Sequence, residues 1–155
     1  MAGVSLLVVL GLLLAGCGGD VSVSRFAVTS AGHDRCPALI KALPGHVADQ
    51  PRRRTTGSAF AAAWGDPAIV LRCGVGHPSG FTASATCLTT NGVDWFVPAA
   101  QIDDLGAGVV LTLVKRTPRI EVRIPAHYRP QGPSDAMVDL TGAVRAHTRV
   151  TGHCH

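Results

Sequence analysis

The stretch SATCLTTNGVDWFV, residues 84–97, decides the fold because it contains the strongest hairpin signal in the chain. Asn91-Gly92 stands between two runs rich in β-branched and aromatic residues, and a type I′ turn needs positive φ at both central positions. Counting outward from this turn places Leu88 opposite Trp95. The sequence therefore predicts two antiparallel strands, over residues 84–90 and 93–97.

Further strands are predicted on both sides of this hairpin. Residues 59–64 and 68–75 are separated by the turn tripeptide Gly65-Asp66-Pro67. Residues 109–115 are apolar on both alternating faces, which is typical of an interior strand. In residues 119–124, isoleucine and valine alternate with charged residues, so one face is expected in the core and the other in water.

Helices are predicted near both ends of the domain, with a shorter helical turn over residues 98–105. Residues 36–43 indicate a short helix with Pro37 in its first turn. Ser134 is expected to cap a terminal helix, in which one apolar stripe contains Met137, Leu140, Val144 and Thr148. The predicted fold class is α+β: an antiparallel sheet of about five strands with an N-terminal and a C-terminal helix, stapled by disulfides.

The N-terminal residues are typical of a bacterial lipoprotein leader. Residues 4–14 are apolar or small without interruption, but this run is shorter than the roughly 20 residues that a transmembrane helix needs. Leu14-Ala15-Gly16-Cys17 matches the lipobox at every position, with cleavage before Cys17 and a diacylglyceryl group on its thiol. We expect a signal peptide over 1–16, a lipidated tether over 17–34 and a single domain over 35–155.

Lipid on Cys17 would decide where the protein works. At about 0.8 kcal/mol per buried CH₂, two or more acyl chains make an effectively permanent anchor. The membrane is therefore an expected partner, and the expected location is the extracytoplasmic face of the cell membrane. Residues 1–5 contain neither Lys nor Arg, whereas a leader should begin with positive charge, so we expect translation to start further upstream.

Four cysteines remain after Cys17, and an even number in an oxidising compartment predicts two disulfides from three connectivities. We expect Cys73 to pair with Cys87 across neighbouring strands of one hairpin, and Cys36 to pair with Cys154 at the two ends of the domain. A metal site is the alternative, formed by His153, Cys154 and His155 with His147. Its spacing is not the usual one for zinc, and a terminal tripeptide is rarely rigid, so no metal is expected.

Composition indicates an ordinary globular domain with a basic surface. The chain has 155 residues, 46% hydrophobic and 15% charged, with a formal net charge of +4. Such a surface favours nucleic acid, anionic lipid or acidic wall polymer as a partner, and an extracellular location excludes nucleic acid from our expectations. The basic run Arg52-Arg53-Arg54 is a candidate contact for anionic headgroups, although a solvated loop is the commoner role of so short a run.

Three sequence blocks resemble a known family. WGDPAIVLRCG at 64–74, NGVDW at 91–95 and RTPRIEV at 116–122 are similar to the blocks of an actinobacterial family of secreted lipoproteins, domain of unknown function 3515. The resemblance covers nearly all of the mature domain. It implies the location, the size and the cysteine plan, and it implies no activity, cofactor or catalytic residue.

No familiar catalytic motif is present in the sequence: there is no G-x-S-x-G, H-E-x-x-H, C-x-x-C or phosphate-binding loop. No cofactor is expected. Two tryptophans with nearby charges are a candidate ligand site, formed by Trp64, Asp66, Arg72, Asp94, Trp95 and Arg116. We favour the interpretation that both rings lie in the core and that the charged groups form turns or ion pairs, because buried tryptophan is common and pockets are few.

Two functions follow as hypotheses from these observations. The first is a non-enzymatic envelope lipoprotein, an accessory or binding module for an envelope protein or for a wall or lipid component. The alternative is a small envelope hydrolase or transferase, with Asp66, Asp94 and nearby arginines as its polar centre. Paired carboxylates in a concave site would favour the enzyme.

Overall fold

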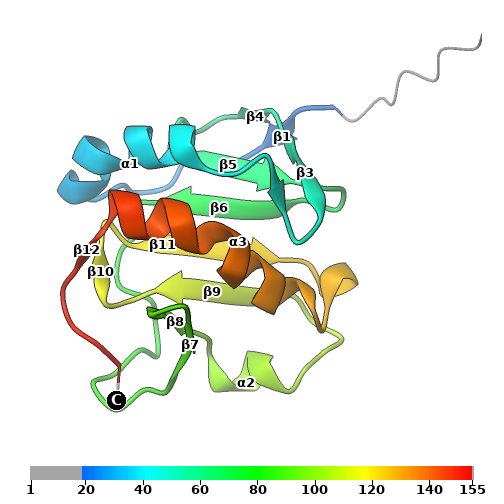
Figure 1. The fold of residues 1–155 in the computed structure, drawn as a ribbon. Coiled ribbons are helices and arrows are strands. Elements are labelled where there is room, and N and C mark those ends of the chain that lie inside the picture. Colours follow the sequence, from blue (N-terminus) through cyan, green and yellow to red (C-terminus); the bar gives the residue numbers. More distant parts are fainter. Residues whose placement is uncertain (1–18, 155) are drawn as a thin grey trace, which may run out of the picture.

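An antiparallel sheet of eight strands forms the centre of the protein (Figure 1). The structure is a computed structural model, and it describes residues 19–154. The strand order is β2-β3-β5-β6-β11-β9-β8-β7. In chain order, the bounds of these strands are His46–Val47 (β2), Gln50–Arg53 (β3), Ala61–Trp64 (β5), Ile69–Cys73 (β6), Cys87–Thr90 (β7), Val93–Phe96 (β8), Val109–Leu113 (β9) and Ile120–Ile124 (β11).

Two long helices, α1 (Ser30–Ala42) and α3 (Gly132–His147), pack side by side on one face of this sheet (Figure 1). Their apolar residues and the helix-facing side chains of the strands form one core, in which Leu39, Leu71 and Leu140 are fully buried. A short helix, α2 (Ala99–Ile102), and a 3₁₀ turn, Ala126–Tyr128, lie outside the two-layer core. No helix in the described range is long and apolar enough to cross a membrane.

Two small accessory sheets hold the ends of the domain. Near the N-terminus, β1 (Val21–Ser22) runs parallel to β4 (Thr55–Thr56). Near the C-terminus, β12 (Arg149–Val150) runs antiparallel to β10 (Arg116–Thr117). Both ends of the described chain are therefore tied to strands from the middle of the sequence.

The α+β class is confirmed, and the strand count of about five was too low. The Asn91-Gly92 turn and the pairing of Leu88 with Trp95 are as predicted. Strands β2 and β3 were missed because their turn is formed by Ala48 and Asp49, which adopt φ values of 49° and 60°. Alanine is not a residue type that marks such a turn, and Asp49 without a neighbouring glycine is a weaker signal than Asn-Gly or Asp-Gly.

Helix α1 begins six residues earlier than predicted, so Pro37 lies in its interior and not in its first turn. Thr29 caps it by accepting a hydrogen bond from Gly32 N, at 3.3 Å. Gly32 packs against Gly74 at the end of β6, where an added Cβ would lie 2.6 Å from the Gly74 Cα. This close approach fixes the start of the helix against the sheet, a tertiary contact that local sequence does not reveal.

Helix α3 also begins earlier than predicted. Its first residue is Gly132, so Ser134 lies within the first turn and donates its hydroxyl to Gln131 O at 2.7 Å. The prediction that Ser134 caps the helix was therefore wrong. The predicted apolar stripe is confirmed, because all four of its residues are buried: Met137, Leu140, Val144 and Thr148.

Two disulfides are present, but the expected pairing was wrong. Cys36 bonds to Cys73, and Cys87 bonds to Cys154, with Cα separations of 5.7 and 6.0 Å. Strands β11, β9 and β8 lie between the strands of Cys73 and Cys87. At about 4.8 Å per strand, four steps exceed the roughly 4.4–6.8 Å that a disulfide spans.

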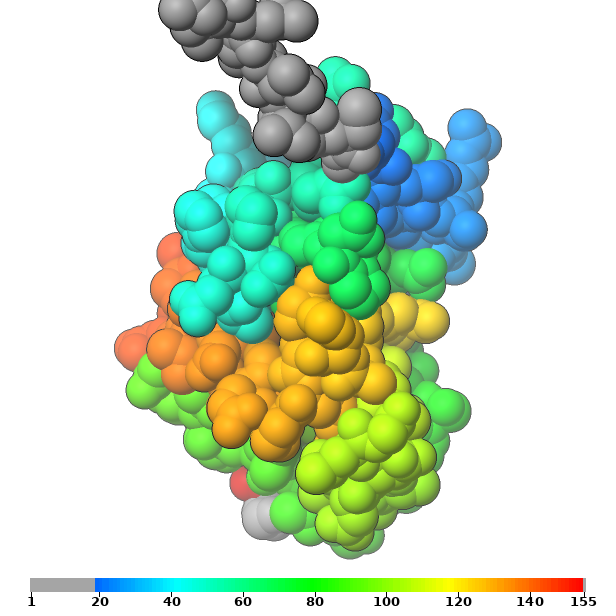
Figure 2. All heavy atoms as spheres, turned by 90° about the vertical axis from the view of Figure 1, so that its right-hand side faces the viewer, coloured from blue at the N-terminus to red at the C-terminus, as the bar shows by residue number. Residues whose placement is uncertain are grey.

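The N-terminal segment is part of the fold and not a tether up to residue 34. Val21 N and Val23 N donate to Arg54 O and Thr56 O, at 2.8 and 2.9 Å, and Val23 is buried. Figure 2 shows the first described residues lying against the surface of the domain. In the sequence, apolar Val21 and Val23 alternate with Ser22, which fits this short strand. Cys17 and the predicted leader lie outside the described residues.

Candidate functional site

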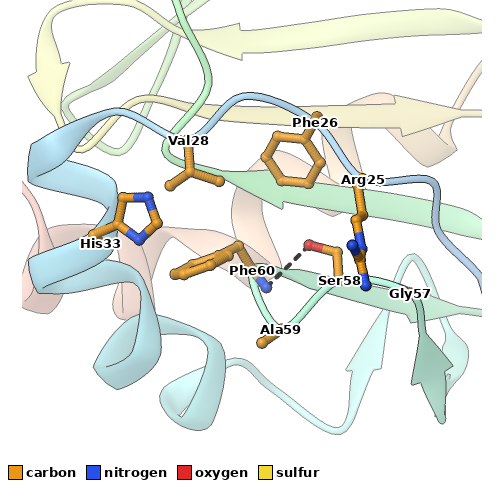
Figure 3. A pocket seen from close by; sticks show the side chains of 8 residues that line it. All are labelled: Arg25, Phe26, Val28, His33, Gly57, Ser58, Ala59 and Phe60. Atoms are coloured by element: carbon orange, nitrogen blue, oxygen red, sulfur yellow. Dashed lines mark hydrogen bonds between the residues drawn. The ribbon is translucent and has the colours of Figure 1, made fainter.

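A pocket of about 240 Å³ opens between the N-terminal segment, the first turn of α1 and the loop from β4 to β5 (Figure 3). Three segments that are distant in the sequence form this pocket, and each contributes residues to its walls. We call it the N-terminal pocket. Its lining residues are Arg25, Phe26, Val28, His33, Gly57, Ser58, Ala59 and Phe60.

The walls of the N-terminal pocket are mainly apolar. Figure 3 shows Phe26 and Val28 facing Phe60 across the hollow, with Ser58 beside Arg25 at one end. The imidazole of His33 meets the Phe60 ring edge to face, with centroids 5.0 Å apart. Phe60 N donates to Ser58 Oγ at 3.2 Å, which fixes the loop. The pocket thus has two aromatic rings on its walls and polar groups at its edge.

Neighbouring backbone contacts hold the N-terminal wall in place. Gly57, at φ +88°, approaches Val23 so closely that a Cβ would lie 2.3 Å from the Val23 carbonyl oxygen. Earlier in the segment, Arg53 donates to Gly19 O, and Arg54 forms a 2.9 Å ion pair with Asp20. The chain is therefore in a fixed position before it reaches the pocket.

The described residues that line this pocket show no serine–histidine hydrogen bond. Of the described residues that line it, Ser58 alone carries a hydroxyl, and that oxygen accepts the Phe60 N–H. No hydrogen bond joins Ser58 to His33 in the described part of the chain. A serine nucleophile requires such contact with a base.

A sequence profile described as Protein of unknown function (DUF3515) matches residues 2–151. The chain belongs to this family. Among the curated proteins and the solved structures, no match to the chain was found. The description of the DUF3515 family names no ligand and no reaction, so the function of this member is argued below from its residues.

In this DUF3515 domain, the predicted ligand residues do not meet at one site. Trp64 is fully buried in the core and donates Nε1 to Pro44 O at 3.0 Å. Asp66 lies in the turn after it, with its side chain 85% exposed and 4.0 Å from Arg53. Arg72 faces the other side of the sheet, where its guanidinium lies 5.3 Å from the centroid of Phe26.

The other three predicted residues lie near the opposite end of the sheet. Asp94 is buried and accepts hydrogen bonds from Thr89 Oγ1 and Cys154 N, at 2.7 and 3.1 Å. Trp95 is fully buried in the core. Arg116 donates Nε to Thr148 Oγ1 at 2.7 Å, and burial lowers its pKa. These contacts fasten the C-terminal segment, and the small hollow that Asp94 and Arg116 both line is too narrow for a water molecule.

The C-terminal residues do not form the alternative metal site within the described range. Cys154 is bonded to Cys87, and His153 Nδ1 lies 3.7 Å from Asp94 Oδ2. No group of three or more potential metal ligands occurs in residues 19–154. His155 lies outside the described residues.

The basic run at 52–54 is occupied by contacts within the domain. Arg52 donates to Ile40 O and Leu43 O, at 2.8 and 3.0 Å, and so closes the C-terminal end of α1. Arg53 donates to Gly65 O and Gly19 O, while Arg54 pairs with Asp20. The run is therefore chiefly structural, which weakens the hypothesis that it rests as a unit on headgroups.

A second hollow of about 240 Å³ lies between α2 and the start of α3, and its lining is largely apolar. Leu88, Ile102 and Leu105 are exposed there by 41–53%. Sequence reasoning missed both hollows, because each is lined by segments that lie far apart in the sequence and that only the fold brings together.

Proposed function

We propose that this protein is a lipoprotein of the cell envelope, anchored through Cys17, which binds a small ligand in the N-terminal pocket and catalyses no reaction. One observation carries the proposal. The segment that follows the lipobox is fixed to the domain from Gly19 onward, and the same segment provides Arg25, Phe26 and Val28 to the pocket. Anchor and pocket thus share one continuous piece of chain.

Chain length supports a position close to the bilayer. An extended chain advances by at most about 3.6 Å per residue, so two residues from Cys17 to Gly19 span at most about 7 Å. Six further residues from Gly19 to Arg25 span at most about 22 Å. With acyl chains on Cys17, the β1 end of the domain would rest on the headgroup layer and the pocket would open near it.

The disulfides and the positions of the carboxylates support an accessory or binding role. Two disulfides stabilise it, as is common for domains outside the cytoplasm. The carboxylates of the enzyme hypothesis are separated: Asp66 lies beside Arg53, while Asp94 is committed to Thr89 and Cys154. No observation in the described residues favours a hydrolase or transferase centre.

Detergent phase partition of the protein expressed in a bacterial host with a lipoprotein-processing pathway tests the anchor. We expect the wild-type protein in the detergent phase and Cys17→Ser in the aqueous phase or retained as an unprocessed precursor. Gly19→Ala is the matched control beyond the cleavage site, because its added Cβ meets nothing within 4 Å. It should partition like the wild type. A processed Cys17→Ser protein that stays in the detergent phase would contradict the proposal.

A further inference from the structure

We infer that the N-terminal pocket binds the phosphate-bearing headgroup of an anionic phospholipid, with Arg25 contacting the phosphate and Phe26, Val28 and Phe60 contacting the apolar part. This inference rests on the proposed function, because the anchor on Cys17 is what brings the pocket to a bilayer.

Charge is the first argument. Of the described residues that line the pocket, Arg25 and His33 are basic and none is acidic. Arg25 is exposed and forms no ion pair with the described residues. An arginine fork matches phosphate oxygens in a bidentate manner, so a free guanidinium at the edge of an aromatic pocket favours an anionic oxygen ligand.

The surroundings strengthen this positive field. Arg72 stacks on Phe26 from the sheet side, and its buried Nε has no hydrogen-bond partner in the described part of the chain. Arg119 lies two residues before Glu121, the residue paired with Arg72, and so projects on the same face. Glu121, the acidic residue paired with Arg72 on this face, is engaged by Arg123 at 2.6 Å. Its charge is thus already balanced.

Shape is the second argument. A volume of about 240 Å³ is below the roughly 300–1,000 Å³ of pockets that enclose a whole drug-sized ligand. It suits one headgroup, with its longer chains left outside. The facing rings of Phe26 and Phe60 provide the apolar contact that glycerol carbons and the first acyl carbons would bury.

Position is the third argument, and it selects lipid over a soluble phosphate ester. The pocket wall is joined to the lipidation site by eight residues of chain, and β1 and β4 hold most of that length in place. Confinement at the bilayer exposes the pocket to headgroups at a very high local concentration. A site with modest intrinsic affinity would then be occupied.

A titration followed by amide NMR tests this inference, using the full chain with Cys17→Ser in a neutral maltoside detergent. Lacking the acylation site, this chain gives a result that does not depend on whether the natural protein is lipidated. The probes are dihexanoylphosphatidylglycerol, dihexanoylphosphatidylcholine and inorganic phosphate. We expect saturable shifts at Gly57, Ser58 and Ala59 with the anionic lipid, and at least tenfold weaker binding of the other two probes.

Two variants assign the contact. Arg25→Gln should weaken the anionic lipid at least tenfold, whereas Arg149→Gln, which removes a charge from another exposed arginine, should leave the affinity unchanged. Absence of saturable shifts, or equal binding of the two lipids, would overturn the inference. Equal binding of inorganic phosphate would overturn the assignment to lipid. Each of these results leaves the anchor on Cys17 to be judged by phase partition alone.

Discussion

The two disulfides differ in loop length and in burial. These two properties predict opposite answers to the question of which bridge stabilises the folded domain more. Cys36 and Cys73 are 37 residues apart, and Cys87 and Cys154 are 67 apart. On the chain-entropy relation, closing these loops contributes about 3.8 and about 4.4 kcal/mol at 25 °C. Loop entropy alone therefore makes the second bridge more stabilising by about 0.6 kcal/mol.

Burial reverses this order. Cys36 and Cys73 are fully buried, whereas Cys87 and Cys154 are only half-buried. Replacing both buried cysteines by alanine deletes two core atoms, and one deleted methyl-sized group costs about 0.5–1.5 kcal/mol. We expect Cys36→Ala with Cys73→Ala to lose about 5–7 kcal/mol, and the other double variant to lose about 4 to 5 kcal/mol.

Urea unfolding in a Cys17→Ser background measures both losses. Trp64 and Trp95 are both fully buried, so tryptophan fluorescence follows the core. Thiol titration is the control: each double variant should show no free thiol, because the remaining pair is bonded. Greater destabilisation from loss of the Cys87–Cys154 bridge would refute the burial argument, and two free thiols would refute the pairing itself.

Three further predictions concern single side chains. Gly32→Ala should cost about 1–3 kcal/mol through overpacking, while Gly142→Ala, in open space on α3, should be neutral or stabilising by up to about 1 kcal/mol in urea unfolding. Burial raises the pKa of Tyr128, so absorbance at 295 nm should show the single tyrosine titrating above about 10 in the folded protein and near 10 in urea. The stability that Tyr128 contributes should be fully present below about pH 10 and should fall as the pH rises above that value. A folded midpoint equal to or below the midpoint in urea would contradict this prediction. Arg52→Ala, which removes two hydrogen bonds to the end of α1, should lower the melting temperature clearly, whereas Arg54→Ala, which removes an exposed ion pair, should lower it less; the reverse order would be inconsistent with the contacts.

Sequence predicted the features that depend on local chemistry. The hairpin at Asn91-Gly92 and its register followed from turn geometry, and the buried stripe of α3 followed from helical spacing. The alternation over β11 likewise predicted which side chains lie in the core: Ile120, Val122 and Ile124. Each of these signals lies within about twenty residues of chain.

Features that depend on sheet order were beyond such signals. The disulfide pairing was wrong because β6 and β7 are separated by three strands, and nothing near Cys73 or Cys87 specifies that order. The N-terminal pocket was missed because a strand of two residues, Val21–Ser22, carries little periodicity. Its partner β4 is equally short, so only long-range packing defines the wall.

The candidate ligand residues illustrate the same limit. Burial of both tryptophans in the core was the favoured interpretation of the sequence, and a pocket was the other hypothesis. Trp64 and Trp95 are fully buried, while the residues that line the pocket, Phe26 and Phe60, stood in segments predicted as a tether and as one end of a strand. Composition shows which side chains are scarce and large, whereas topology determines which of them face a hollow.

The most direct test of the proposed anchor is mass spectrometry of the N-terminal peptide from protein extracted from bacterial membranes. The proposal predicts that Cys17 is the first residue and carries a diacylglyceryl group. An intact leader, or Cys17 with an unmodified thiol, would contradict it and would remove the reason for placing the pocket at a bilayer.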